Sequence, residues 1–574
     1  MKVCGAWVSA SVLLAAGGVC NATVFRVDAA AGASGDGLSW ETAFRDLADA
    51  LAAASAGDEI WLKEGVHTPA TADEWFVLKE GVSLYGGFAG TETSRDQRDA
   101  SVHTTVVSAD VGQDDIVGSG PLWYINWNRV TPNSEHVMTG ANLTPATVID
   151  GLVIADGDGG FGGGMSLVNA SPTILSCTFR HNLAAFGWGG AIHLDNSSPV
   201  ISDCSFIENY VHGGYGGGIA DTGSSAPVVR DCVFRYNIAV AIGPDAGGAG
   251  IAHWAGSDVT VQRCIFDQNT ARGFQPVGNY IGYGGGLFNW GAHMLVDRCV
   301  FTGNKATRGG GFISWGPSTL VNCLFDSNQA VPQPNDPYPE LGGEGAAVAG
   351  SDAQASNTVM INCTVARNTG KKFAVYGGWN STIIGVNSVI YSNVATHPEV
   401  VGGYREQIGG NFELAYSCVA KIFDPPAPGD DPIDPENLPG CIDDNPLFVN
   451  PAAGDLRLGA GSPCIDAADN AEVPAWVDLD LDGHERYFDD PATPNTGHGS
   501  PPLVDMGAYE FGAQVPSPCP GDVDGDNDVD STDLNLVLTD FGCTSACPGD
   551  ADGDGDADST DLNIVLTAFG TACN

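Results

Sequence analysis

The sequence predicts an all-β fold in the form of a parallel solenoid, and a long internal repeat is the main observation behind this prediction. Between about residue 160 and residue 395, a Cys-x-Phe-x-x-Asn pattern repeatedly follows a glycine-rich segment. Clear copies begin at Cys177, Cys204, Cys232, Cys264, Cys299 and Cys323, and weaker copies begin at Cys363 and Ser388. Successive clear copies are 24 to 35 residues apart. A repeat of this length, with insertions between units, is typical of stacked coils.

The spacing within each unit assigns its residues to places on a strand. The Cys and the Phe are two residues apart, so they point to the same side, and we expect that side to be the interior. The Asn, three residues after the Phe, falls where the strand must bend, and its amide can bond the same amide of the next coil. Glycines before each strand permit backbone angles that other residues resist. No 3.6-residue period is present, which disfavours a helical repeat.

Two parts of the repeat also carry a family resemblance. Gly189-Gly190-Ala191-Ile192 and the Phe206-x-x-Asn209 segment resemble the repeats of polymorphic outer-membrane proteins and of right-handed parallel β-helix proteins. The resemblance implies a single right-handed parallel β-helix of the pectin-lyase-like fold over residues 23–511, with N- and C-terminal caps. It covers most of the chain, and it is specific for the fold but not for an activity.

The sequence of residues 1–22 predicts a secretory signal. Lys2 gives a positive start, Val8 to Val19 form a short apolar core, and residues 20–22 offer a cleavage site. Val19 fits a lipoprotein signal poorly. We therefore expect a secreted, extracellular or cell-surface associated protein.

Three elements are expected before the first clear repeat. Apolar residues at helical spacing over Trp40 to Ala54, with Ser39 as N-cap, predict a helix that caps the first coil. Ile60 to Leu62 and Val82 to Phe88 are expected to be strands of the first coils.

The net charge of the chain argues against two kinds of partner. The formal net charge is −47 at pH 7, which argues against binding to nucleic acid or to an anionic membrane surface. No stretch after the signal has the length of a transmembrane helix.

The 16 cysteines fall into several groups. The seven from Cys177 to Cys363 should form an interior column of free thiols, with redox or metal roles as alternatives. The order of Cys519, Cys543, Cys547 and Cys573 suggests the pairs 519–543 and 547–573, although four cysteines allow three connectivities. Three further cysteines, Cys418, Cys441 and Cys464, have no assignment from the sequence.

Residues 519–574, after a linker at 512–518, form a separate module made of two copies. Oxygen ligands stand at positions 1, 3, 5, 7, 9 and 12 of each loop, which is the pattern of an EF-hand calcium site. We expect two calcium ions. The ligands are Asp522, Asp524, Asp526, Asp528, Asp530 and Asp533 in the first loop, and Asp550, Asp552, Asp554, Asp556, Asp558 and Asp561 in the second. Each loop should be followed by one helix, at Leu534 to Phe541 and at Leu562 to Phe569.

Two tandem loop–helix units with Asp at position 12 resemble a type I dockerin. The resemblance implies docking to a cohesin-like domain through positions 10 and 11 of the loops, here Ser531, Thr532, Ser559 and Thr560. The alternative is a calcium-folded module without a partner.

Candidate catalytic residues are not evident. Polysaccharide lyases of this fold need a cation close to clustered carboxylates, and the candidates are Lys305 and Arg308, or Arg367 with Lys371 and Lys372. None of them is beside such a cluster in the sequence, so surface salt bridges are the favoured interpretation. Residues 478–483 could be another calcium loop, but Arg486 at the ninth position weakens that interpretation.

A column of tryptophans leads to the functional hypothesis. Trp254, Trp290 and Trp315 each stand three residues after the start of a strand, so they should stack along one edge. Exposed rings would bind sugars, whereas buried rings would fill the corner of the coil. We therefore expect an exported β-helix protein, docked through its calcium module, that binds extracellular polysaccharide or a cell surface. The alternative is a lyase, epimerase or glycoside hydrolase that its dockerin delivers to a polysaccharide.

Overall fold

The computed structural model describes residues 22–115, 131–242, 245–254, 256–273, 281–332, 343–397, 404–424, 434–513, 521–523, 529–543, 547–551 and 557–570. The expected signal segment, apart from its last residue, lies outside these residues. No helix in the ranges described is long and apolar enough to cross a membrane.

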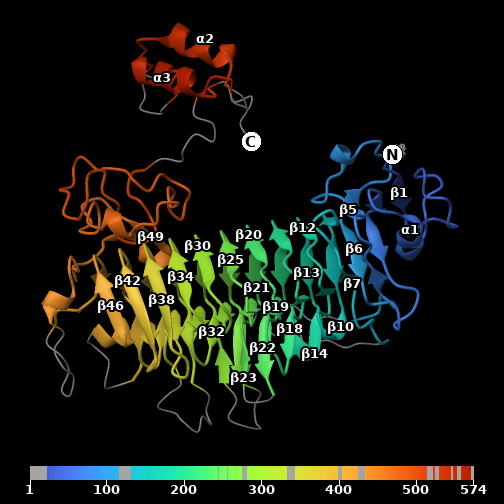
Figure 1. Ribbon diagram of the computed structural model, residues 1–574, viewed down its shortest axis with the longest axis horizontal. Coiled ribbons are helices and arrows are strands. Elements are labelled where there is room, and N and C mark those ends of the chain that lie inside the picture. The colour runs from blue at the N-terminus through green and yellow to red at the C-terminus, as the bar shows by residue number, and fades with distance from the viewer. Residues whose placement is uncertain are drawn as a thin grey trace, which may run out of the picture.

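The body of the protein is a parallel solenoid whose coils contain four short strands, one in each of four sheets. One coil consists of β14 (Leu183–Trp188), β15 (Ile192–Asp195), β16 (Val200–Ser202) and β17 (Ser205–Ile207). Figure 1 shows equivalent strands of successive coils side by side along the long axis, such as β14, β18 (Tyr210–His212) and β22 (Ile238–Ala241). Counted over the described residues, the largest sheet has 13 strands, from β1 (Val24–Val27) to β46 (Phe412–Ala415), and the next has 12, from β3 (Gly65–His67) to β47 (Cys418–Val419). The third sheet has 11 strands, from β4 (Phe76–Val77) to β45 (Ile408–Gly410). The fourth has 9, from β10 (Asp158–Phe161) to β44 (Val394–Ala395).

The interior is filled by the residues that the repeat predicts. In adjacent coils Phe206 pairs in register with Phe234, and their rings stack with centroids 4.6 Å apart. Phe234 also stacks on Phe266 at 4.9 Å, and all three side chains are fully buried. The cysteine column is buried and its thiols are free. Both expectations are thus confirmed. The Phe layer continues from Phe179 to Phe325, and aliphatic residues replace it in the last coils.

Asparagine side chains form a second ladder inside the coil. The Asn209 amide donates to the Asn237 carbonyl oxygen at 3.0 Å, and Asn237 donates to Asn269 at 2.9 Å. The ladder begins at Asn182 and continues through Asn304, Asn328, Asn368 and Asn393 to Gln407. Each amide also donates to a backbone carbonyl of the preceding coil, as Asn237 does to Phe206 at 2.8 Å. The ladder therefore satisfies polar groups at a buried bend.

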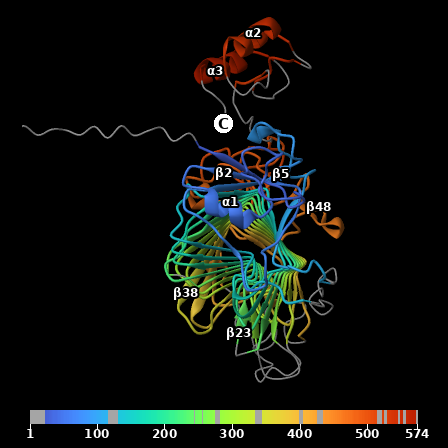
Figure 2. The same cartoon turned by 90° about the vertical axis from the view of Figure 1, so that its right-hand side faces the viewer.

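The N-terminal cap contains the expected helix, but the helix is shorter than the sequence indicated. Helix α1 spans Leu47–Ala53 and is N-capped by Asp46, whereas Ser39 was expected at that place. Residues before it extend the sheet instead, because Phe44 bridges Val27 and its N–H donates to the Arg26 carbonyl at 2.9 Å. Figure 2, which views this end of the solenoid, shows α1 across the first coils. The expected first strands are confirmed as β2 (Glu59–Lys63) and β5 (Ser83–Phe88).

The C-terminal cap covers the outside of the last coils. It contains the antiparallel strands β48 (Phe448–Asn450) and β49 (Asp455–Leu458). Short 3-10 helices lie in and before it at η3 (Tyr404–Glu406), η4 (Pro435–Asn437), η5 (Pro451–Ala453) and η6 (Asn470–Glu472), and η1 (Arg95–Gln97) lies near the N-terminus. Apolar residues of the cap pack on outward-facing Val321, Ile361 and Val389. The cap thus adds a second core outside the coil.

The calcium loop considered at residues 478–483 is a hairpin turn in the structure. Leu479 and Glu485 form an antiparallel bridge. The Asp480 carboxylate accepts from the N–H groups of His484 at 2.8 Å and Glu510 at 2.9 Å. This carboxylate ties two segments of the cap together, so a structural role accounts for its position.

The C-terminal module contains two helices that begin earlier than expected. Helix α2 spans Ser531–Asp540 and helix α3 spans Ser559–Ala568, with Asp530 and Asp558 as their N-caps. Both helices therefore start three residues before the sequence suggested, because these N-cap aspartates and the position-12 aspartates form capping boxes. Val529, Val537 and Val565 are buried between the two halves.

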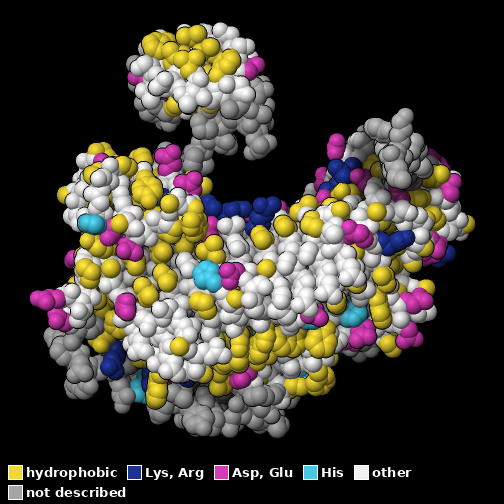
Figure 3. Space-filling view, in the orientation of Figure 1, with side chains coloured by type: hydrophobic (Ala, Val, Ile, Leu, Met, Phe, Trp, Pro, Cys, Tyr) yellow, Lys and Arg dark blue, Asp and Glu magenta, His cyan; other side chains and the backbone are white. Residues whose placement is uncertain are grey.

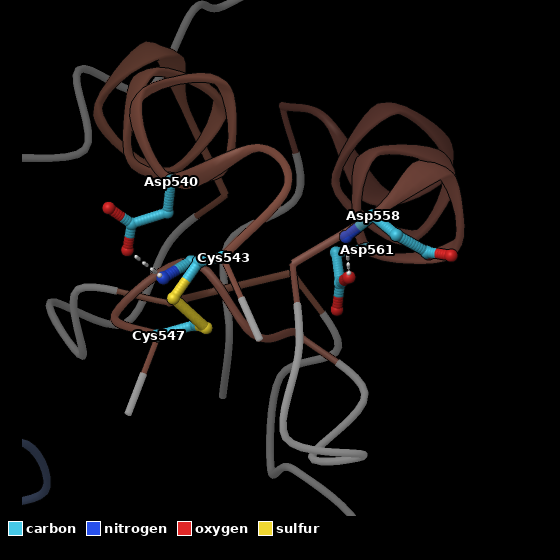
Figure 4. Close-up of a disulfide and its surroundings, with 6 residues drawn as sticks. Asp540, Cys543, Cys547, Asp558 and Asp561 are labelled. Atoms are coloured by element: carbon cyan, nitrogen blue, oxygen red, sulfur yellow. Dashed lines mark hydrogen bonds between the residues drawn. A yellow bond between two sulfur atoms is a disulfide. The ribbon is translucent and has the colours of Figure 1, made fainter. Parts of the chain in front are cut away.

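The disulfide pairing suggested for the module is wrong for its two described cysteines. Cys543 is bonded to Cys547, with Cα atoms 5.8 Å apart (Figure 4). This bond closes a short turn at a normal Cα separation. Cys519 and Cys573 lie outside the described residues.

Candidate functional site

An aromatic surface runs along the outside of the 11-stranded sheet, and we call it the aromatic face. Its members are Trp188, Tyr215, Trp254, Tyr283, Phe288, Trp290 and Trp315. They come from successive coils and touch one another ring to ring, as Tyr215 and Trp254 do at 5.0 Å. Their cluster is separate from the interior core of the solenoid. The face thus follows the axis over several coils, as a binding surface for a linear polymer would.

The three predicted tryptophans stack in the order of the coils. The ring centroids of Trp254 and Trp290 are 4.0 Å apart at 26°, and those of Trp290 and Trp315 are 4.1 Å apart at 43°. The rings are half-buried, so one part of each meets solvent. The expected stacking and partial exposure are confirmed. Only the first pair is close to parallel, because Trp315 also packs edge-on against Tyr283 at 5.1 Å.

A buried polar pair supports the middle of the aromatic face. Asp221 and His253 are fully buried, and an oxygen of Asp221 lies 2.8 Å from Nδ1 of His253. The same carboxylate accepts from the Trp254 N–H at 2.9 Å. In the next coil the N–H of Trp290 donates to the His253 carbonyl at 2.8 Å. The tryptophan backbones are therefore rigidly held.

A cluster of charged residues continues the face toward the C-terminus, and we call it the Glu344 cluster. The backbone of Arg308 forms a parallel β-bridge with Tyr283 of the previous coil. The N–H of Gly309 donates to the backbone carbonyl of Glu344 in the next coil. The Arg308 guanidinium lies 3.3 Å from Glu344 Oε2 and 2.8 Å from Asp352 Oδ2. One cation therefore links two carboxylates from a single later coil.

Aromatic residues complete the Glu344 cluster. The Tyr376 hydroxyl and the Trp379 N–H both donate to Asp352 Oδ1 at 3.0 Å. Lys372 Nζ approaches Glu344 Oε1 at 3.8 Å. The Trp379 side chain is 76% exposed, in contrast to the half-buried rings of the aromatic face.

Glu344 has an unusual environment for a carboxyl group. Burial raises its pKa to about 7, although Arg308 and Lys372 oppose this shift. Its Oε2 is buried and accepts no hydrogen bond. Burial alone would lower the pKa of Arg308, but Glu344 and Asp352 outweigh it and the pKa is raised. Arg308 therefore remains charged while Glu344 exchanges a proton near neutral pH.

The Glu344 cluster opens into a cavity of about 620 Å³. Its wall includes Glu344, Lys372, Tyr376, Trp379 and Arg405. A larger cavity of about 800 Å³, by the 13-stranded sheet, has carboxylates in its lining but neither Lys nor Arg. We place the candidate site at the smaller cavity, because the Glu344 cluster continues the aromatic face and the cavity wall includes Glu344, whose pKa is raised.

The structure changes the interpretation of the cationic residues. Arg308 and Lys372 were expected to make surface salt bridges away from any carboxylate cluster, and instead both face Glu344. Arg367 does form an ion pair with Asp326, as expected for a surface salt bridge. Glu344 and Asp352 were missed. The repeat itself could have indicated Glu344, because Arg308 and Glu344 precede equivalent glycines in adjacent coils.

The calcium ligands predicted in the module are described at positions 1, 9 and 12 of each loop. The central ligands Asp524, Asp526, Asp528, Asp552, Asp554 and Asp556 lie outside the described residues. Asp533 is buried, and its two oxygens accept from the N–H groups of Val523 at 2.7 Å and Asp530 at 2.8 Å. Asp561 accepts in the same way from the N–H groups of Ala551 and Asp558, and Figure 4 marks the hydrogen bond between Asp558 and Asp561. A carboxylate oxygen that accepts one hydrogen bond can also ligate a cation, so these contacts are compatible with the proposed calcium site.

A further acidic group lies in the solenoid. Ligand oxygens of Asp110, Asp114 and Asp115 come within 4.8 Å of one another. The Asn133 amide donates to Asp115 at 2.8 Å. We assign this group no role. On the face shown in Figure 3, acidic side chains are scattered, whereas hydrophobic ones gather over the lower edge near β14 and β18 (Tyr210–His212).

Comparison with known proteins supports the fold. Residues 137–412 match the family model described as a right-handed beta helix region. No curated protein matches the sequence.

Several solved structures are similar to the chain. A pectate lyase Pel9A is 14% identical with a TM-score of 0.41, covering 86% of this chain and 97% of its own. XylC in complex with xylose is 9% identical with a TM-score of 0.38, covering 74% and 87%. A PL6 family alginate lyase, AlyGC, is 11% identical with a TM-score of 0.32, covering 72% and 52%. At these scores the likeness carries no argument about activity.

Proposed function

We propose that the protein is exported and binds extracellular polysaccharide along its aromatic face, while its C-terminal module docks it to a cohesin-like partner with calcium. The observation that carries the first part is the stack of Trp254, Trp290 and Trp315, which are partly exposed and come from successive coils. Aromatic rings bind the apolar faces of sugars, and a linear row of them suits a chain. The net charge of −47 suits a secreted protein in water that contains calcium.

The module supports the docking proposal through two matching surfaces. The residues proposed to contact the partner, Ser531, Thr532, Ser559 and Thr560, are all exposed at the starts of the helices. Each helix also exposes apolar side chains, Leu538 and Phe541 in or after α2 and Leu566 and Phe569 in or after α3. Because residues i and i+7 share one face of a helix, Ser531 lies above Leu538. Each half thus offers the same polar and apolar contacts to a partner.

Replacing Trp290 by Ala should weaken retention on the bound polysaccharide. The loss of one stacked ring is expected to lower affinity about 3- to 10-fold, corresponding to about 0.5–1.5 kcal/mol. The melting temperature should also fall, because the ring packs against Trp254, Trp315 and Phe288, so binding is compared at a temperature at which both proteins are folded. Affinity electrophoresis in gels that contain a panel of neutral and acidic polysaccharides measures this effect.

The matched control is Trp476→Ala, at an indole that is 50% exposed in the C-terminal cap. This variant should migrate as the wild type does. Equal retardation of the Trp290 and Trp476 variants, or no retardation of the wild type by any polysaccharide, would remove the binding proposal.

A second candidate function is cleavage of the bound polysaccharide, and the environment of Glu344 favours it. A general acid works best when its pKa is close to the working pH, and burial brings the pKa of Glu344 to about 7. Protonated Glu344 would donate to the glycosidic oxygen as the bond breaks, and a water molecule that adds to the sugar would return a proton. Trp379 would support the sugar ring, and Asp352 would position Arg308.

Replacing Glu344 by Gln should change how stability depends on pH. The pKa of Glu344 in the folded protein is above the usual value of 4.5. Its contribution to the free energy of unfolding is therefore fully present below pH 4.5 and is lost as the pH rises through about 7. The wild type should therefore lose about 1–3 kcal/mol over this interval relative to the variant. Melting curves at pH 4.5, 6 and 8 measure the difference.

Glu413→Gln is the control, since Glu413 is an exposed carboxylate beside the other cavity. The same variants separate catalysis from stability. If the protein cleaves a polysaccharide, the Glu344→Gln protein should release reducing ends about 10²- to 10⁴-fold more slowly, while the Glu413→Gln protein retains activity. Full activity of the Glu344→Gln variant would rule out Glu344 as the acid.

A further inference from the structure

The three cysteines without an assignment from the sequence occupy two different environments. Cys418, in β47, and Cys464, in the C-terminal cap, are both fully buried in the second core outside the coil. Cys441 is partly buried and packs against the interior core instead. The structure therefore places Cys418 and Cys464 in one cluster and Cys441 in another.

Cys418 belongs to the last coil but points out of it. It pairs in register with Val389, and both join the cluster that the cap covers, whereas its neighbour Val419 belongs to the interior core. Cys464 approaches from the cap, whose backbone is tied to the coils by the Gly507 N–H donating to the Asn387 carbonyl at 2.7 Å. Both thiols are free and lie in the same buried cluster, where the Cys418 S–H donates to the Asp444 carbonyl at 3.2 Å. The neighbouring Cys464 and burial raise the pKa of Cys418.

This arrangement differs from the interior cysteine column. In the column, side chains of in-register strands extend in parallel, and each backbone N–H can engage the next sulfur, as Cys177 does with Cys204 at 3.4 Å. A disulfide needs a dihedral angle near 90°, which parallel side chains do not offer. Cys418 and Cys464 instead come from a coil strand and from the cap and lie in one buried cluster, so no strand register holds their side chains parallel.

We propose that Cys418 and Cys464 form a disulfide that locks the C-terminal cap onto the last coil; its formation in the cell rests on the export proposed above. Each thiol loses its hydrogen as the sulfur–sulfur bond forms. Two electrons and two protons pass to a disulfide oxidant, such as oxidised glutathione or a thiol–disulfide exchange protein, which is reduced to two thiols. Because both thiols are fully buried, the exchange takes place before the cap closes.

The test uses the full chain, reduced, unfolded, and refolded with a mixture of oxidised and reduced glutathione. The product is denatured, alkylated with iodoacetamide without reduction, digested and analysed by mass spectrometry. The expected result is a linked pair of peptides with Cys418 and Cys464 that disappears after dithiothreitol. Cys441 and the interior column should be alkylated in both samples, and Cys543–Cys547 is the internal positive control. Because the oxidant is supplied, the result does not depend on export.

Variants make the pairing specific. Cys441→Ser should retain the link, and Cys464→Ser should lose it and leave Cys418 alkylated. The melting temperature of the oxidised wild type should fall by several degrees on reduction, whereas that of the Cys464→Ser protein should not respond. Alkylation of both Cys418 and Cys464 in the oxidised wild type, or a link from either to Cys441, would overturn the proposal. This peptide analysis is made on the wild type, so it decides the proposal even if a variant fails to fold.

Discussion

Replacing Phe234 by Asp should abolish folding of the central coils. Phe234 is fully buried and stacks between Phe206 and Phe266 at 4.6 and 4.9 Å, so no solvent can reach a carboxylate at this place. Loss of the ring costs about 3–5 kcal/mol, and an unpaired buried charge adds several more. The sum is comparable with the whole stability of a typical domain, about 5–15 kcal/mol. Soluble yield, thermal unfolding and limited proteolysis measure the outcome.

Phe186→Asp is the matched control, because Phe186 in β14 is 71% exposed. Its stability should stay within about 0.5 kcal/mol of the wild type, as for most surface substitutions. In a solenoid each coil contacts only its neighbours, so protease cleavage in the Phe234 variant should begin near that coil. If the Phe234 variant melted within about 2 °C of the wild type, the interior assignment of the phenylalanine column would be wrong.

The repeat predicted the solenoid well because the same residue type stands at the same position of each coil and packs on its counterpart in the next coil. An in-register stack needs only the correct spacing within each unit, so Phe206, Phe234 and Asn237 could be placed from the sequence. The cysteine column followed from the same spacing. The ends were less predictable. The start of α1 depends on the bridge between Phe44 and Val27, which residues far apart in the sequence form.

The candidate site was less predictable than the fold, since its residues come from three separate coils. Arg308, Glu344 and Lys372 meet because the coils stack, and long insertions between them hide the register. The raised pKa of Glu344 arises from burial, which no local pattern reveals. The pairing of Cys418 with Cys464 is similar, because it depends on how the cap folds back over the last coil.

Removal of calcium should unfold the C-terminal module while the solenoid stays folded. Six aspartates stand within each loop of twelve residues, and neighbouring carboxylates at about 4 Å repel by about 1 kcal/mol per pair even in water. Helices α2 and α3 are too short to persist alone, and the cluster that joins them has three buried valines with partly buried leucines and alanines around them. We therefore expect ion binding and folding of residues 519–574 to be coupled. Circular dichroism of the 519–574 fragment should show helix with calcium and lose it with chelator.

The double substitution Asp522→Ala and Asp550→Ala in the full chain separates this effect from the solenoid. It removes the first ligand of each loop but leaves the carboxylates of Asp533 and Asp561, which hold loop backbone groups. The variant should lose the calcium response and cohesin binding, while its main melting transition stays unchanged. Ser531→Ala with Ser559→Ala is the companion variant, since it changes the proposed partner surface and should retain the calcium response. A fragment whose spectrum ignores both calcium and chelator would contradict the EF-hand interpretation, and the docking proposal would be lost with it.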